Sequence, residues 1–207
     1  MKKKKKSCDE RIYCRYVKRA LDILFSLWLL ILLLLPMFVI AVIIRADSSG
    51  NSIFKQKRLG RGGKVFVCYK FRTMYKYAPS TKSAAELENR DRYITRVGKF
   101  LRRSSLDEIP QLFNVLKGEM SLVGPRPLIC EEEEIHRQRM ERGVYALRPG
   151  ITGMAQINGR NLLCDEEKLK SDSYYLQNIR IGLDIKILFY TFFKVAKGDG
   201  INVQTKK

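Results

Sequence analysis

The stretch from Ile23 to Ile44 reads ILFSLWLLILLLLPMFVIAVII, and only Ser26 and Pro36 interrupt its apolar residues. As a helix rising roughly 1.5 Å per residue it extends about 33 Å, enough to cross the hydrocarbon core of a bilayer. Two other interpretations are a helix buried in a soluble core and a cleaved signal peptide. Soluble helices normally keep a polar face, and signal peptides have a shorter apolar region, so we expect a membrane helix.

Basic residues flank this stretch on both sides: Lys2–Lys6, Arg11, Arg15, Lys18 and Arg19 before it, and Arg45, Lys55, Lys57, Arg58, Arg61 and Lys64 after it. Positive flanks prefer the cytoplasmic side, so a straight crossing would place one flank outside, whereas a re-entrant hairpin keeps both inside. Pro36 removes a backbone donor and clashes with the preceding turn. It would either break the helix into such a hairpin or merely kink a spanning helix, and both alternatives stay open at this point.

Composition restricts the structural class of the whole chain. Its 207 residues suit one domain with a buried core, and 45% hydrophobic residues exclude wholesale disorder. Lysine and arginine total 40 against 21 acidic residues, a net charge of +19 that predicts a polyanionic partner such as nucleic acid, anionic lipid or a phosphorylated substrate. The single histidine, His136, excludes a multi-histidine metal site. The five cysteines form no CxxC pair, which excludes a zinc module or a disulfide framework.

Outside the apolar stretch the patterns predict a mainly α fold with a small β-hairpin. Residues 52–71 are expected to form two strands around the glycine-rich turn Gly60–Gly63. Residues 72–90 are typical of a mobile loop, and residues 143–161 of irregular structure. Helices are expected at Arg92–Arg103, from Ser105–Asp107 to Lys117–Gly118, and at Ile129–Arg142, Asp165–Arg180 and Leu183–Lys197. The last of these is apolar with lysines at intervals, so it lies either in the core or in a membrane interface.

An acidic pair, Asp107–Glu108, follows two arginines and precedes a predicted helix. One interpretation is plain helix capping, by Asp107 or by a capping box of Ser105 and Glu108. The other is phosphate chemistry. An aspartate that is ionised at pH 7 can attack phosphorus, a neighbouring carboxylate can hold Mg²⁺, and Arg102 or Arg103 can neutralise the charge on the transferring group.

Two further patches present arginines from turns. In Gly124–Pro127 two prolines fix the backbone around Arg126, and in Arg148–Gly153, followed by Asn158–Arg160, glycines let the backbone approach an anion. Each patch also fits an ordinary basic turn, and neither matches a Walker loop or a dinucleotide fingerprint. Together with the acidic pair, in a basic chain attached to a membrane, they predict phosphate-ester chemistry at a membrane surface.

The sequence closely resembles the monotopic phosphoglycosyl transferases, the bacterial sugar transferase family, in their minimal single-domain form. The resemblance runs from about Lys18 to Lys197 through these segments in order: Lys18–Asp22, the apolar stretch with Pro36, Phe54–Gly60, Tyr69–Met74, Ser105–Glu108, Gln111–Gly118, Ser121–Pro127 and Arg148–Gly153. Met154 departs from the pattern, since an aromatic residue often follows Gly-Ile-Thr-Gly in the family. Lys2–Lys6 lie outside the pattern and are expected to strengthen attraction to anionic lipid.

The resemblance implies that a sugar-1-phosphate moves from a UDP-sugar to undecaprenyl (polyprenyl) phosphate. UMP leaves, and the transfer is the first membrane step of bacterial glycan assembly. It further implies that Asp107 forms a covalent phosphosugar intermediate and that Glu108 helps bind Mg²⁺. The resemblance also implies phosphate or substrate contacts for Arg102, Arg126 and Arg148. Lys70 and Asp172 match further polar positions of the family and are implied to bind substrate, with less certain roles.

The expected organisation is a basic N-terminal segment at 1–22, a re-entrant membrane helix at 23–44 broken near Pro36, and a catalytic domain at 45–207 with interfacial amphipathic helices. The resemblance implies the bacterial inner membrane, with the catalytic domain on the cytoplasmic face and no nucleic-acid partner. Two rival hypotheses stay open. One is direct displacement in a ternary complex, with Asp107 as a base or metal ligand; the other is a non-enzymatic scaffold whose basic face holds anionic lipid or nucleic acid.

Overall fold

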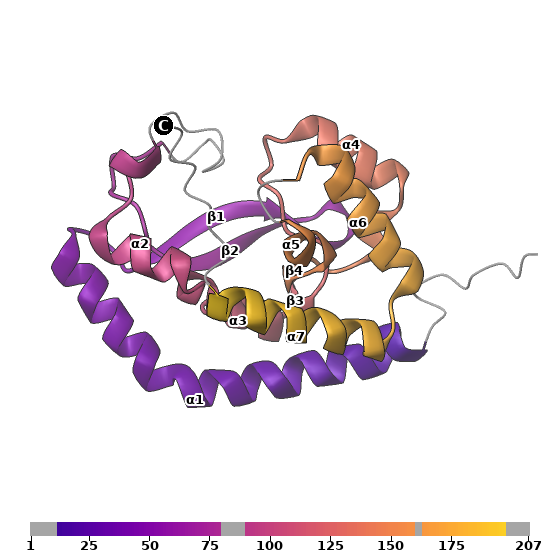
Figure 1. The fold of residues 1–207 in the computed structure, drawn as a ribbon, viewed down its shortest axis with the longest axis horizontal. Helices are drawn as coiled ribbons and strands as arrows, with labels where there is room; N and C mark the ends of the chain where they lie inside the picture. Colours follow the sequence, from indigo (N-terminus) through magenta and orange to yellow (C-terminus); the bar gives the residue numbers. More distant parts are fainter. Residues whose placement is uncertain (1–11, 80–89, 160–162, 198–207) are drawn as a thin grey trace, which may run out of the picture.

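One long helix, α1 (Lys18–Asp47), runs along the base of the molecule. The computed structural model describes residues 12–79, 90–159 and 163–197, so Lys2–Lys6, Arg160 and most of the predicted loop at 72–90 lie outside the described residues. Figure 1 shows α1 bent near its middle, with both ends rising toward the same body. The chain stays helical through Pro36, so the predicted break is a bend, which the missing N–H and the crowding ring of proline explain.

Both ends of α1 are tied to the polar part of the protein. At its start, Lys18 Nζ lies 2.7 Å from Asp184 Oδ2. At its end, the guanidinium of Arg72 donates to the carbonyl oxygen of Ser48 at 2.6 Å and to that of Ile44 at 3.1 Å. A straight crossing would put the two ends on opposite sides of a bilayer, so the shared attachment favours the re-entrant arrangement. The helix also exceeds the predicted 23–44 at both ends.

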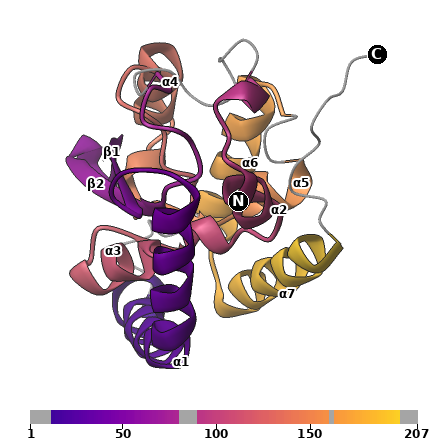
Figure 2. The same ribbon diagram turned by 90° about the vertical axis from the view of Figure 1, so that its left-hand side faces the viewer.

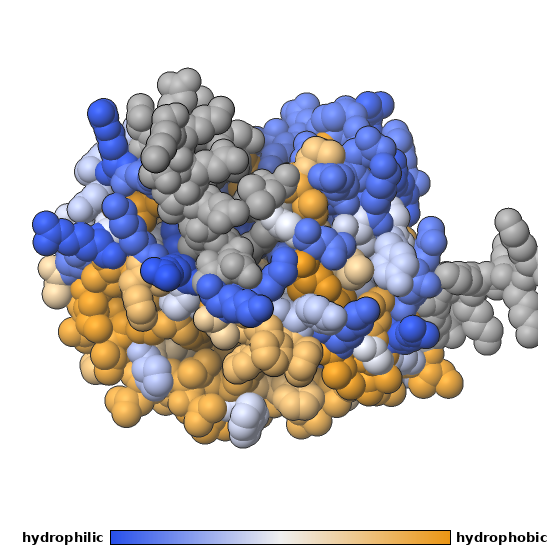
Figure 3. All heavy atoms as spheres, in the orientation of Figure 1, coloured by the Kyte–Doolittle hydropathy of each residue, from blue (hydrophilic) through white to orange (hydrophobic). Residues whose placement is uncertain are grey.

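An apolar face covers the side of the molecule formed by α1 and α7 (Ile181–Lys197). Figure 3 shows this face as a continuous hydrophobic band, and Figure 2 shows α7 beside α1 at the same level. Leu35 of α1 is 71% exposed and Phe192 of α7 is 69% exposed. Among the described residues, α1 is the helix long and apolar enough to cross a membrane. An exposed apolar face of this extent indicates a membrane-binding surface, which agrees with the interfacial interpretation of the last helix.

The predicted β-hairpin is confirmed. Strand β1 (Ile53–Leu59) pairs antiparallel with β2 (Val65–Phe71), with Gln56 opposite Cys68. The turn between them passes through Gly62, whose φ of 68° is a left-handed conformation that glycine adopts without steric cost. The hairpin crosses the middle of the molecule, and β2 packs against α3 (Gln111–Lys117).

The predicted helices exist. Those not yet described are α2 (Arg96–Arg103), α4 (Glu133–Glu141) and α6 (Asp165–Asn178). The short helix α5 (Met154–Asn158) was not predicted, because residues 143–161 were expected to be irregular. Helices α2, α3 and α4 begin later than expected, α6 begins at the predicted Asp165, and α7 begins at Ile181, before the predicted Leu183. Helix α2 starts at Arg96 because Thr95 Oγ1 accepts a hydrogen bond from the Gly98 N–H and acts as the N-cap. Helix α4 starts after Ile129 because Ile129 pairs with Arg58 of β1 as an isolated β-bridge.

Two short parallel strands were not predicted. Strand β3 (Ser121–Val123) pairs with β4 (Gly150–Thr152), within a region expected to be irregular. A Cβ atom on Gly150 would lie 2.1 Å from the Gly124 nitrogen, and one on Gly153 would lie 2.0 Å from the Gly124 oxygen. These glycines therefore let two backbone segments pack together. The sequence analysis expected the glycines of Arg148–Gly153 to let the backbone approach an anion. In the structure Gly150 and Gly153 instead let it approach the backbone of Gly124.

Candidate active site

The acidic pair lies on a tight 3-10 turn, Leu106–Glu108, between α2 and α3. Ser105, just before the turn, has a φ of 55° and is the one non-glycine residue with positive φ among the described residues. Leu106 packs against the core cluster that contains Met37 of α1. Glu108 is 7% exposed and Asp107 is half-buried. The turn is thus fixed on a core cluster to which α1 contributes, and it presents Asp107 beside a buried carboxylate.

Helix capping does not account for the pair. The N-cap of α3 is Pro110, and Ser105 makes no side-chain capping bond at the start of the turn. The predicted end of the helix is confirmed, since Gly118 adopts a φ of 85° directly after Lys117. The acidic residues therefore precede the helix without serving as its cap.

Two cations from distant parts of the chain reach Glu108. Lys70 Nζ, from β2, lies 2.9 Å from Glu108 Oε1. Arg126 Nη1, from the Gly124–Pro127 turn after β3, lies 3.4 Å from the same oxygen. The structure therefore brings together four of the seven predicted site residues: Lys70, Asp107, Glu108 and Arg126. Two positive side chains at Glu108, the residue next to Asp107, can bring a negatively charged phosphate ester close to an attacking oxygen.

Asp172 reaches this cluster only through Arg139, which the sequence analysis missed. Arg139 Nη2 lies 2.5 Å from Asp172 Oδ2, and Arg139 Nη1 donates to the backbone oxygen of Arg126 at 2.8 Å. Asp172 is 1% exposed and Arg139 is 2% exposed. Burial raises the pKa of Asp172, while the positive charge of Arg139 opposes that rise. The pair thus positions the Arg126 turn. One feature of the sequence could have indicated that Arg139 is buried: it lies four residues after the apolar Ile135, on the same face of the helix.

Arg102 lies at the end of α2 and ties that helix to the chain that follows β2. Its Nε donates to Thr73 Oγ1 at 2.8 Å. Since Thr73 follows Lys70 by three residues and Arg102 precedes Asp107 by five, this contact links the strand that carries Lys70 to the turn that carries Asp107.

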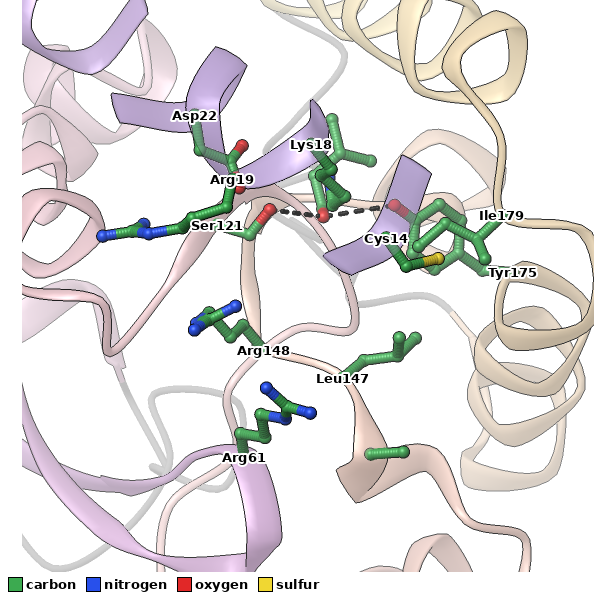
Figure 4. A pocket seen from close by; sticks show the side chains of 12 residues that line it. Cys14, Lys18, Arg19, Asp22, Arg61, Ser121, Leu147, Arg148, Tyr175 and Ile179 are labelled. Carbon is green, nitrogen blue, oxygen red and sulfur yellow. Dashed lines mark hydrogen bonds between the residues drawn. The ribbon is translucent and has the colours of Figure 1, made fainter. Parts of the chain in front are cut away.

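Arg148 is separated from the acidic pair by the length of α3. Its Nε donates to the Gly118 carbonyl oxygen at 2.9 Å, at the C-terminal end of that helix. With a rise of roughly 1.5 Å per residue, about 15 Å lie along the chain between Glu108 and Gly118. Arg148 lines a cavity there with Arg61, as Figure 4 shows.

A family model described as "Bacterial sugar transferase" matches residues 13–198. The chain belongs to the bacterial sugar transferase family. It is 41% identical over 186 residues to "Uncharacterized sugar transferase EpsL" of Bacillus subtilis, with 89% of this chain and 90% of the relative covered. It is 40% identical over 200 residues to "Undecaprenyl-phosphate galactose phosphotransferase" of Salmonella typhimurium, covering 90% of this chain and 42% of the relative. The family resemblance found in the sequence is thereby confirmed.

Several relatives in the bacterial sugar transferase family are much longer than this chain. "UDP-glucose:undecaprenyl-phosphate glucose-1-phosphate transferase" of Escherichia coli is 41% identical over 187 residues, which cover 87% of this chain and 40% of that protein. The chain therefore spans less than half the length of such relatives.

The acidic residues of this family member suit one mode of magnesium binding. Among the described residues, no group of three or more histidine, cysteine or acidic side chains could cage a metal ion. Mg²⁺ is commonly held by one or two protein carboxylates, with water and substrate phosphates as the other ligands. Asp107 and Glu108 are adjacent oxygen donors of this kind, so the residues present fit that mode.

Proposed function

We propose that this protein transfers a sugar-1-phosphate from a UDP-sugar to undecaprenyl phosphate through a covalent intermediate on Asp107, releasing UMP. The observation that carries the proposal is the turn with Asp107 and Glu108. It packs against a core cluster to which α1 contributes, and Lys70 and Arg126 face Glu108. The printed names of the Salmonella typhimurium and Escherichia coli relatives, which describe transfer to undecaprenyl phosphate, support the choice of acceptor.

In the first step, a carboxylate oxygen of Asp107 attacks the phosphorus that bears the sugar. A bond forms between that oxygen and phosphorus, and the bond from phosphorus to the bridging oxygen breaks. UMP leaves with the electron pair. Lys70 and Arg126 contribute positive charge where negative charge grows on the phosphoryl oxygens. No base is needed, because an aspartate is already ionised at neutral pH.

In the second step, a phosphate oxygen of the lipid acceptor attacks the same phosphorus atom. The bond from phosphorus to the Asp107 oxygen breaks, which restores the carboxylate and yields a polyprenyl-diphosphate sugar. Two successive displacements let one small site serve a soluble donor and a lipid acceptor in turn. The apolar face of α1 would keep the lipid acceptor next to the turn.

The decisive experiment is a UMP-release assay on purified protein with undecaprenyl phosphate, Mg²⁺ and a series of UDP-sugars. We expect release from at least one donor; none from any donor would favour the non-enzymatic scaffold. Exchange of labelled UMP into the donor without lipid acceptor then separates the two enzymatic routes. Only a covalent intermediate permits that exchange, so its absence would favour direct displacement in a ternary complex.

Mg²⁺ dependence tests the role of Glu108. Asp107 and Glu108 would hold the ion, which when bound would neutralise charge on the diphosphate. Glu108→Gln removes the negative charge that Lys70 and Arg126 now face, and weakens oxygen coordination. We expect the Mg²⁺ concentration for half-maximal rate to rise roughly tenfold or more. Glu134→Gln, on an exposed helix face, is the control; an unchanged titration for Glu108→Gln would remove its metal role.

The proposed location is the inner membrane, with both flanks of α1 on the cytoplasmic face. Both ends of α1 attach to one body, so lysines before and after it are expected on the same side. A membrane-impermeant lysine reagent should label Lys55 and Lys57 only after cells are opened. Labelling of either flank from outside intact cells would contradict this topology.

A further inference from the structure

A cavity of about 420 Å³ lies at the end of α3 that is remote from Asp107. It is enclosed by the start of α1, the turn of the β-hairpin, β3, the segment at 146–148 and the end of α6. Its volume falls in the range of about 300–1,000 Å³ that is usual for small-molecule sites. None of the steps proposed above uses it.

Positive charge gathers on one wall of this cavity. Figure 4 shows Arg148 and Arg61 directed into the same space from two different segments. Burial, together with the positive charges of Arg19 and Arg61, lowers the pKa of Arg148. The acidic side chain on the wall, Asp22, already accepts a hydrogen bond from the Leu122 N–H at 3.1 Å. Like charges brought together in this way favour an anion between them.

Hydrogen bonds to the C-terminal end of α3 account for two of the arginines on this wall. Arg19 donates to the carbonyl oxygen of Val115 at 2.8 Å, and Arg148 Nε donates to that of Gly118 at 2.9 Å. These bonds explain why two arginines sit at the C-terminal end of α3. Arg61 reaches the cavity from a different segment, the turn of the β-hairpin.

The opposite wall is apolar. Val123, Leu147 and Ile179 contribute hydrophobic side chains to it. Arg19, on the basic wall, comes four residues before Ile23, where the apolar part of α1 begins, so this end of α1 belongs at the membrane–water boundary. A site that is basic on one side, apolar on the other and placed at this boundary matches an amphiphile.

We propose that this cavity binds an amphiphilic phosphate, with its phosphate group between Arg61 and Arg148 and its alkyl chain against Leu147 and Ile179. The site is separate from the place of phosphotransfer, because α3 stands between them. It therefore serves to hold a lipid that does not react. The inference does not depend on the phosphotransfer mechanism proposed above.

Photo-crosslinking of the full-length protein in a neutral detergent tests the proposal. The probe is dodecyl phosphate with a diazirine on its alkyl chain, and the readout is the set of labelled peptides. We expect label on the peptides that contain Leu147 or Ile179. Arg61→Ala should lower that label about tenfold at subsaturating probe, the effect of losing one charge-assisted contact. Arg61 is exposed in a turn, so the variant should keep the wild-type melting temperature.

Lys64→Ala is the matched control, because it removes one positive charge from the same turn without touching the cavity wall. It should leave the label unchanged. Equal losses in the two variants would overturn the site in favour of general attraction to a basic surface. Unlabelled dodecyl phosphate should displace the probe and inorganic phosphate should not. If inorganic phosphate displaced the probe at equal concentration, the cavity would bind a free anion, and the proposal of a lipid ligand would be wrong.

The crosslinking result is separable from the reaction. The label at Leu147 and Ile179 is expected to persist in Asp107→Asn protein, because Asp107 lies beyond the other end of α3. Absence of the cavity label in wild-type protein would overturn this inference and leave the phosphotransfer proposal standing. Absence of UMP release from wild-type protein that still takes up the label would overturn the phosphotransfer proposal and leave this inference standing.

Discussion

Asp107→Asn is expected to abolish both UMP release and the capture of label from a radioactive donor sugar. The amide has no negative charge and is a poor nucleophile toward phosphorus, so no covalent intermediate forms. Removal of a nucleophile typically costs a thousandfold or more in turnover, so we expect a loss of roughly that size. The substitution is nearly isosteric at a half-buried position, and the melting temperature should stay close to that of the wild type.

Asp165→Asn is the matched control for that experiment. Asp165 is an exposed aspartate at the start of α6 that pairs with Lys168 three residues later. Exposed pairs of this kind contribute little, so both activity and melting temperature should stay at the wild-type level. Undiminished activity of Asp107→Asn protein would remove the nucleophile assignment. Persistent label capture would indicate that another side chain attacks the donor.

The sequence predicted those parts of the fold that local patterns determine. The apolar run at Ile23–Ile44, the glycine turn of the hairpin and the end of α3 at Gly118 each depend on neighbouring residues alone. The acidic pair was found for the same reason, because Asp107 and Glu108 are adjacent. Arg126 was found from the two prolines beside it and Lys70 from the family resemblance, but nothing in the spacing of Lys70, Glu108 and Arg126 shows that they meet.

The parts that were missed depend on tertiary contacts. Strands β3 and β4 have three residues each, which is too short for an alternating pattern, and they form because the backbones approach at Gly124 and Gly150. The glutamates around Arg139 indicate a solvated helix, yet Arg139 itself is buried. Arg148 resembles the other arginine turns in sequence, but the fold carries it to the opposite end of α3.

Replacement of Asp172 by asparagine is expected to lower the free energy of unfolding by about 3–5 kcal/mol, because it leaves the charge of buried Arg139 without a counter-charge. The midpoint of denaturant unfolding measures this loss. Glu134→Gln, which weakens an exposed pair with Arg137, should leave the midpoint unchanged. A wild-type midpoint for Asp172→Asn protein would mean that Arg139 finds another partner or is not held there.

The double variant Asp172→Leu with Arg139→Met separates stability from positioning. Buried ion pairs replaced by apolar residues of similar volume often keep or gain stability, so the unfolding midpoint should return toward that of the wild type. Phosphotransfer should stay low, because no side chain then donates to the Arg126 backbone oxygen and the turn that faces Glu108 loosens. Recovery of both properties together would assign the pair to stability alone. Recovery of stability without activity would show that the Asp172–Arg139 pair holds Arg126 in position, although the pair contacts neither substrate nor metal. A buried aspartate can thus affect a reaction in which it takes no direct part.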